Sequence, residues 1–226
     1  MIAQKPIKTV LFDLDGTLAD TAPDLAAALN AVREAEGKPA LAFEKIRPAV
    51  SHGGKALIEV GFDLSADSEE AERLRLQLLD HYRENIARHT RLFPGMDKVL
   101  AYIEESGANW GVVTNKPGWL TEPLMAELGL QPRAACIVSG DTLDERKPHP
   151  APLLYACELA GSQPEQCVYI GDAERDIIAG NRAGMHTLLA LFGYLEDADR
   201  PHEWGADGSV ESAEDILHWL RAGTTN

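Results

Sequence analysis

The chain has 226 residues, 45% hydrophobic and 25% charged, so it is long enough for one large or two modest domains with a hydrophobic core. Its 21 basic and 36 acidic residues give a formal net charge of −15, which argues against nucleic acid as the main partner because that binding needs a basic face. The sequence has no apolar run that could cross a membrane, and residues 1–6 lack the apolar core of a signal peptide. Three cysteines without metal-ligand spacing are typical of reduced thiols. We therefore expect a cytoplasmic protein that binds neither nucleic acid nor membrane.

The first expected element is a strand that runs into the motif Phe-Asp-Leu-Asp-Gly-Thr-Leu at residues 12–18. Asp13 and Asp15 lie one residue apart at its end, and extended backbone would point both side chains to the same side. Two like charges so placed repel each other unless a cation, a proton or a substrate separates them. The pair therefore indicates a metal-assisted site, with one carboxylate as nucleophile or ligand and the other as acid or base.

Residues 21–90 show helical spacing and no strand pattern. The expected helices cover residues 23–36, with Thr21 as candidate N-cap, and residues 43–50, 55–60 and 68–88. A turn signal, Phe-Pro-Gly, follows at residues 93–95. We interpret residues 21–90 as a small all-helical domain inserted after the first strand.

This insert contains a glycine-rich turn at an expected helix start, where backbone N–H groups can meet an anion. The candidate substrate-binding residues on or beside the turn are Arg47, Ser51, His52, Gly53 and Lys55. They form either a loop that reads the leaving group of a substrate or ordinary capping and surface positions.

Strands and helices alternate in the second half of the chain. The expected strands cover residues 109–114, 136–139, 167–170 and 187–191, and the expected helices cover residues 119–128, 151–160, 176–183 and 212–221. This alternation predicts an α/β fold whose parallel sheet is covered on both faces. Residues 1–20 and 91–226 would form this core domain.

Polar residues follow four of the expected elements at the edge of the sheet where ligands of open parallel sheets bind. They are Asp13 and Asp15, then Thr114 and Asn115, then Lys147, and finally Asp172 and Asp176. Taken by itself, Lys147 could equally be a solvated lysine in a loop. Asp176 could equally be a carboxylate at a helix N-terminus, where the helix dipole favours negative charge.

This set of side chains suits phosphoryl transfer, which needs a metal and fixed donors for a negatively charged group. Asp13 and Asp172 would ligate Mg²⁺, with Asp176 orienting the site. Thr114 and Lys147 would hold phosphoryl oxygens. Asp13 could then attack phosphorus to form an aspartyl-phosphate, and Asp15 would protonate the leaving oxygen and later take a proton from water.

The same motifs resemble those of the haloacid dehalogenase superfamily. They are the motif at residues 12–18, Val-Val-Thr-Asn-Lys at 112–116, Lys-Pro at 147–148 and Gly-Asp-Ala-Glu-Arg-Asp at 171–176. The resemblance implies a Rossmann-like core with a helical cap and a covalent aspartyl intermediate. By it, Asp13, the backbone carbonyl of Asp15 and Asp172 ligate Mg²⁺, while Thr114 and Lys147 bind phosphate. The presence of Asp15 separates the chain from the dehalogenases themselves.

Within the superfamily the chain resembles phosphoglycolate phosphatases and, more closely, the N-acetylmuramic acid 6-phosphate phosphatases of peptidoglycan recycling. The segments concerned are residues 50–53, 89–91, 110–117 and 204–207. The cap departs from the latter group where Gly54 and Lys55 follow Ser-His-Gly, so both substrates stay open. A phosphosugar mutase and a non-catalytic phosphometabolite-binding protein are the rival functions, and either a monomer or a homodimer is compatible with the sequence.

Overall fold

The computed structural model describes residues 6–65 and 67–223. The expectation about a signal peptide falls almost wholly on residues 1–5, outside the described part. Six parallel strands form the main sheet in the order β5-β4-β1-β6-β7-β8. Their bounds are β1 Thr9–Phe12, β4 Asn109–Val113, β5 Cys136–Val138, β6 Cys167–Gly171, β7 His186–Ala190 and β8 Gly208–Val210. The expected α/β class with a parallel sheet is confirmed.

Helices cover both faces of this sheet, because side chains alternate along its buried strands. Val10 and Phe12 of β1 pack on one face with α5 Met96–Glu105 and α9 Ala213–Gly223. Leu11 points to the other face, where α7 Ala151–Ala160 and α8 Glu174–Ala183 pack. Another helix, α6 Gly118–Glu127, follows β4. The arrangement leaves the carboxyl ends of β1, β4 and β6 side by side.

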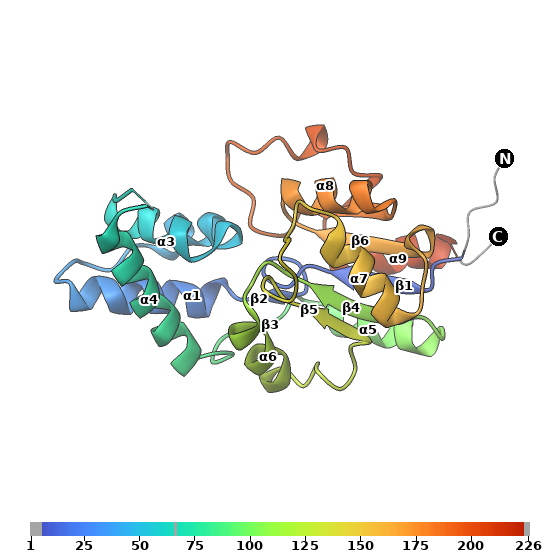
Figure 1. The fold of residues 1–226 in the computed structure, drawn as a ribbon, viewed down its shortest axis with the longest axis horizontal. Coiled ribbons are helices and arrows are strands. Elements are labelled where there is room, and N and C mark those ends of the chain that lie inside the picture. Colours follow the sequence, from blue (N-terminus) through green and yellow to red (C-terminus); the bar gives the residue numbers. More distant parts are fainter. Residues whose placement is uncertain (1–5, 66, 224–226) are drawn as a thin grey trace.

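Residues 22–84 form a helical unit with its own hydrophobic core, which Figure 1 shows beyond one end of the sheet. Its elements are α1 Ala22–Ala35, α2 Phe43–Ile46, the 3₁₀ helix η1 Arg47–His52, α3 Gly53–Phe62 and α4 Glu69–Glu84. Leu29, Leu57 and Leu78 are fully buried there. We call this unit the cap.

Two short segments join the cap to the sheet, and they pair as antiparallel strands β2 Ala19–Asp20 and β3 Arg91–Leu92. Beside them the buried carboxylate of Asp24 accepts hydrogen bonds from the backbone N–H groups of His89 and Thr90 at 2.9 Å each. It also accepts one from the Thr90 hydroxyl at 2.7 Å. Asp24 thus ties the two connecting segments together.

Two local expectations were wrong. Thr21 stands at the N-cap position of α1 but makes no side-chain cap, because its hydroxyl donates to Asp15 at 2.6 Å. The expected helix at residues 43–50 divides into α2 and η1, where Pro48 supplies no N–H. The strands β2 and β3 were not expected, and they flank residues 21–90, the region for which no strand was predicted.

Helix α5 and strand β8 were not expected at all, although both belong to the core. Among the described residues, no helix combines the length and apolar character needed to span a membrane. The three cysteines, Cys136, Cys157 and Cys167, are all buried and free, as expected.

Candidate active site

Asp13 is the first residue after the buried central strand β1. Its backbone N–H donates to the Ile170 carbonyl of β6 at 2.9 Å, which continues the ladder and fixes the residue. Its Oδ1 accepts hydrogen bonds from the Leu14 N–H at 2.7 Å and lies 2.9 Å from Lys147 Nζ. Within the described residues no hydrogen bond reaches Oδ2, so one carboxylate oxygen is fixed and the other is available.

The Lys147 ammonium lies at the centre of the site, and its side chain is only 1% exposed. Four oxygens lie within 2.9 Å of Nζ, and they belong to Asp13, Asp176, the Val113 backbone and the Tyr169 hydroxyl. This burial rules out the interpretation of Lys147 as a solvated loop lysine. Asn115 holds its backbone from both sides, donating to the Lys147 carbonyl at 2.9 Å and accepting from its N–H at 3.1 Å.

Asp172 and Asp176 follow β6 and are both buried. Asp172 accepts hydrogen bonds from the Ser51 hydroxyl at 2.8 Å, the Tyr194 N–H at 2.9 Å and the Thr17 hydroxyl at 3.2 Å. Asp176 Oδ2 accepts from the Ala173 N–H at 3.0 Å, while Oδ1 lies 2.8 Å from Lys147 Nζ. Asp176 therefore both caps α8 and holds the lysine.

The electrostatics of the three carboxyl groups differ. Burial, with the neighbouring charges of Asp13 and Asp176, raises the pKa of Asp172 to about 7. Burial also raises the pKa of Asp13, although Lys147 opposes that rise. For Asp176, burial is outweighed by Lys147 and Arg175, which lower its pKa. The site as a whole has less positive charge than its buried carboxylates require.

These carboxylates fit a divalent cation. Asp13, Asp172 and Asp176 each offer an oxygen, and the three oxygens lie within 4.8 Å of one another. Hard cations such as Mg²⁺ take oxygen ligands, and the raised pKa values of Asp13 and Asp172 show that added positive charge would be favourable there. Lys147 and Arg175 already compensate the charge of Asp176, whose pKa is lowered. The pKa values of Asp13 and Asp172 are raised instead, so these two carboxylates are the better ligands.

Close packing at Asp172 explains two glycines. Gly16 has a φ of +87°, and a Cβ there would collide with the Asp172 carboxylate. A Cβ at Gly193 would collide with the Asp172 side chain and with the Gly16 carbonyl. The backbone therefore approaches this carboxylate as closely as sterics allow.

Asp15 has partners entirely different from those of Asp13. Its Oδ1 accepts hydrogen bonds from the Thr21 hydroxyl at 2.6 Å and the Lys116 ammonium at 2.9 Å. Thr114, the first residue after β4, is buried, and its hydroxyl accepts a hydrogen bond from the Lys116 N–H at 3.1 Å. The two carboxylates are thus held in different environments, as two different chemical roles require.

Some of the expected cap residues reach the core. Ser51 hydrogen-bonds Asp172 directly, and Arg47 donates to the Phe192 and Gly193 carbonyls at 3.2 and 3.0 Å. The imidazole of His52 lies 3.5 Å from the Glu196 carboxylate on the other side of the boundary. Gly53 has a positive φ of 79° at the start of α3. These contacts place η1 against the sheet edge.

Lys55 is not brought to this site. Its ammonium lies 3.2 Å from the carboxylate of Asp67 within the cap, with side chains 58% and 89% exposed. A solvent-exposed pair of this kind adds little stability. The geometry favours a surface role for Lys55, and it favours a supporting role for Asn115 because its amide is used on the Lys147 backbone.

Four residues at the site, Lys116, Tyr169, Arg175 and Tyr194, were not among the site residues predicted from the sequence. Arg175 donates to the Ser51 carbonyl at 2.7 Å, and Tyr169 hydrogen-bonds both Lys147 and the Val113 carbonyl. Tyr194 links Asp172 to the cap connection, where its hydroxyl donates to Asp20 at 2.7 Å. Lys116 and Arg175 stand inside recognised motifs, which was an available signal. Tyr169 and Tyr194 do not belong to the polar motifs, and their contacts at the site depend on packing.

Comparison with known proteins agrees with this geometry. The family model described as haloacid dehalogenase-like hydrolase matches residues 10–190. An N-acetylmuramic acid 6-phosphate phosphatase from Pseudomonas aeruginosa is 43% identical over 214 residues, 95% of each chain. A phosphoglycolate phosphatase from Xanthomonas campestris pv. campestris is 44% identical over 204 residues, 90% of this chain and 92% of that one.

Among solved structures, a predicted phosphoglycolate phosphatase from Haemophilus somnus superposes with a TM-score of 0.83 at 28% identity. The match covers 94% of this chain and 97% of that one. The family model spans most of the chain, and the relatives match it nearly end to end. The chain belongs to the haloacid dehalogenase-like hydrolase family.

Proposed function

We propose that the protein is a Mg²⁺-dependent phosphomonoester hydrolase that acts on a small phosphorylated metabolite through an aspartyl-phosphate on Asp13. The observation that carries this proposal is the buried Lys147 ammonium, which lies 2.9 Å from Asp13 and 2.8 Å from Asp176. A lysine so placed offsets the charge of a nucleophilic carboxylate that must meet a phosphate dianion. The protein's net charge of −15 makes this local positive charge necessary.

In the first step, Asp13 Oδ2 attacks phosphorus while the bond from phosphorus to the leaving oxygen breaks. Asp15 donates a proton to that oxygen. In the second step, Asp15 takes a proton from a water molecule as this water attacks the aspartyl-phosphate. The bond between phosphorus and Asp13 then breaks, which restores the carboxylate and releases inorganic phosphate.

The carboxylates of Asp13 and Asp172 and the backbone carbonyl of Asp15 would hold Mg²⁺. The cation would stabilise the negative charge of the phosphoryl oxygens. The Thr114 hydroxyl would donate to one of these oxygens. The Lys147 ammonium has three protons and already has four oxygen neighbours, so a phosphoryl contact replaces one of them. Asp176 and Asn115 keep the lysine in place.

For the substrate we propose N-acetylmuramic acid 6-phosphate, which would place the protein in peptidoglycan recycling. The support is the relative from Pseudomonas aeruginosa that is named for this activity and matches 95% of the chain. The phosphoglycolate phosphatase from Xanthomonas campestris pv. campestris is as similar, so 2-phosphoglycolate is the second candidate. The two substrates differ greatly in size, and the cap must discriminate between them.

Phosphate release from both compounds, measured as kcat/KM in the presence of Mg²⁺, tests this assignment. We expect N-acetylmuramic acid 6-phosphate to be preferred, and His52→Ala to change its KM more than that of 2-phosphoglycolate, because the imidazole lies at the boundary of cap and core. A large preference for 2-phosphoglycolate would reject the recycling assignment but keep the hydrolase. An isomerised sugar phosphate without free phosphate would instead indicate a mutase, and no turnover at all a binding protein.

A further inference from the structure

Lys116 follows Thr114 and Asn115 beyond the end of β4, and its ammonium lies inside the protein. The side chain is only 7% exposed, and Nζ lies 2.9 Å from Asp15 Oδ1. A lysine side chain is normally solvated, so a buried one needs compensating negative charge. Neither the phosphate-binding role of Lys147 nor the metal ligands explain why a second lysine is buried here.

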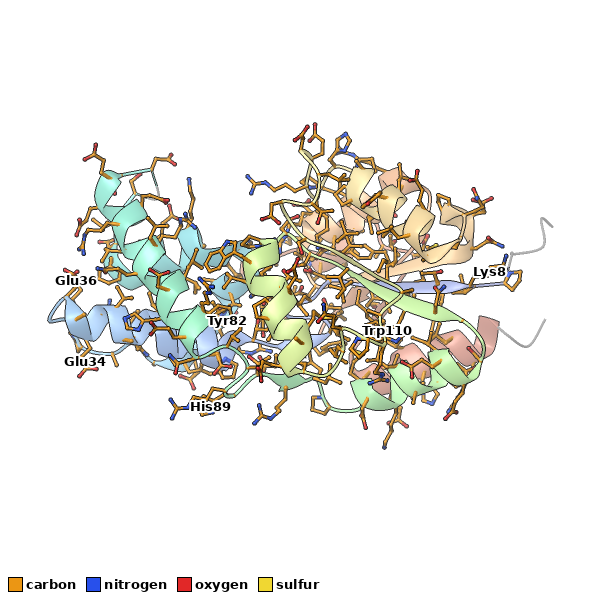
Figure 2. All side chains as sticks on the ribbon, turned by 60° about the horizontal axis from the view of Figure 1, so that its bottom comes forward. Lys8, Glu34, Glu36, Tyr82, His89 and Trp110 are labelled. Carbon is orange, nitrogen blue, oxygen red and sulfur yellow. The ribbon has the colours of Figure 1, made fainter. Side chains whose placement is uncertain are left out.

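The second partner of this ammonium comes from the cap. Nζ lies 4.4 Å from the ring centroid of Tyr82 on α4, a distance at which a cation is attracted to an aromatic ring. Figure 2 shows Tyr82 where the cap meets the core, far from Glu34 and Glu36 at the cap's outer end. Tyr82 is fully buried, and its hydroxyl has no hydrogen-bond partner among the residues that the structure describes. Burial raises the pKa of this hydroxyl and the nearby Lys116 charge opposes that rise, so the ammonium acts on the hydroxyl as well as on the ring.

The hydrogen bonds at Asp15 are all on one oxygen. Thr21 and Lys116 both donate to Oδ1, and within the described part of the chain no hydrogen bond reaches Oδ2. An oxygen that accepts two donors is a poor place for a proton, whereas the other oxygen can carry one. The arrangement leaves Oδ2 as the oxygen of Asp15 that is not engaged by these donors.

We propose that Lys116 is a positioning residue for proton transfer: it holds Asp15 by Oδ1, leaves Oδ2 to exchange the proton, and depends on the Tyr82 ring of the docked cap. The inference rests on the proposed function, in which Asp15 Oδ2 gives its proton to the leaving oxygen in the first step. In the second step the same oxygen takes a proton from water. Because Tyr82 belongs to the cap and contacts Lys116, the Asp15 carboxylate is correctly positioned only while the cap is docked.

The dependence of rate on the leaving group tests this role, because a good leaving group needs little protonation. Lys116→Met is compared with the unmodified protein on p-nitrophenyl phosphate, phenyl phosphate and N-acetylmuramic acid 6-phosphate. We expect kcat to fall about 10²-fold or more on the sugar phosphate and much less on p-nitrophenyl phosphate, with KM nearly unchanged. Lys116→Arg keeps the charge and restores part of the lost kcat.

Tyr82→Leu gives a second variant, which should show the same dependence on the leaving group in weaker form. Lys98→Met, at an exposed position on α5, is the matched control and should keep the wild-type rates. An equal fall of kcat on all three substrates would overturn the proposal, and so would a raised KM with unchanged kcat. Failure of the unmodified protein to hydrolyse any of them would contradict the proposed function instead.

Discussion

At the scale of single residues, Lys147 is the buried positive charge at the centre of the candidate site. It is surrounded by oxygens from Asp13, Asp176, Val113 and Tyr169, and only 1% of its side chain is exposed. Replacing it with methionine leaves two buried carboxylates without their counter-charge, which costs about 3–5 kcal/mol. We expect Lys147→Met to lose phosphate release and to unfold at clearly lower urea concentration. Unchanged stability would show that the two carboxylates do not depend on the lysine.

The carboxyl group of Asp172 should make the stability of the metal-free protein depend on pH. Its pKa is raised to about 7 in the folded chain, above the value of 3.8 in an unfolded one. Between these values the folded state binds more protons than the unfolded state, so this group makes stability fall as pH rises from about 4 to about 7. Asp172→Asn removes that contribution.

Urea unfolding of both proteins in the presence of a chelator measures this effect. As pH rises from about 4 to about 7, we expect the unfolding free energy of the unmodified protein to fall relative to that of Asp172→Asn. A stability difference that is constant between pH 4 and pH 8 would show that Asp172 does not titrate in that range.

At the scale of elements, the cap is attached to the sheet through β2, β3 and the clamp at Asp24. Asp24→Ala leaves the buried Thr90 hydroxyl and two backbone N–H groups without their acceptor, and such losses cost about 1–3 kcal/mol each. We expect a fall in unfolding free energy of at least about 3 kcal/mol, measured by urea denaturation. Asp80→Ala, at an exposed position on α4, is the control and should change stability little. Equal effects of the two substitutions would contradict the clamp.

An element could be predicted when a short stretch of sequence carries its pattern, and could not when it forms only through contacts between distant residues. β1, β4 and β6 are short apolar runs that end in polar motifs, so these strands were expected. Residues 21–90 show helical spacing, so a helical unit was expected there. β2 and β3 have two residues each and exist only because the chain returns to its starting point, which no local pattern records. The core motifs were recognisable because their chemistry requires fixed residue types. Tyr82 and Tyr194 were not, because their roles depend on the docked position of the cap.

At the scale of the whole molecule, cap and core meet directly at the candidate metal site. Ser51 of the cap hydrogen-bonds Asp172, and Arg175 of the core donates to the Ser51 carbonyl. Closure of the cap over this edge would exclude bulk water from the aspartyl-phosphate. In the proposed function the sheet would supply the reacting groups, and the cap would supply the lid and the contacts with the leaving group.

Mg²⁺ should stabilise the whole fold, because a ligand that binds only the folded state shifts the unfolding equilibrium. At a hundred times the dissociation constant the gain is about 2.7 kcal/mol, which for a chain of this size raises Tm by about 5–10 °C. Thermal unfolding with Mg²⁺ and with a chelator measures the shift. Asp172→Asn should lose most of it, whereas an equal shift in that variant would place the cation elsewhere.

The most direct test of the proposed chemistry is phosphate release by Asp13→Asn in the presence of Mg²⁺. Asparagine nearly preserves the shape of the side chain but removes the nucleophilic carboxylate, so the fold should survive, as circular dichroism would verify. We expect the rate to fall by more than about 10³-fold. If the folded variant kept a tenth or more of the wild-type rate, Asp13 would not be the nucleophile and the aspartyl-phosphate mechanism would be wrong.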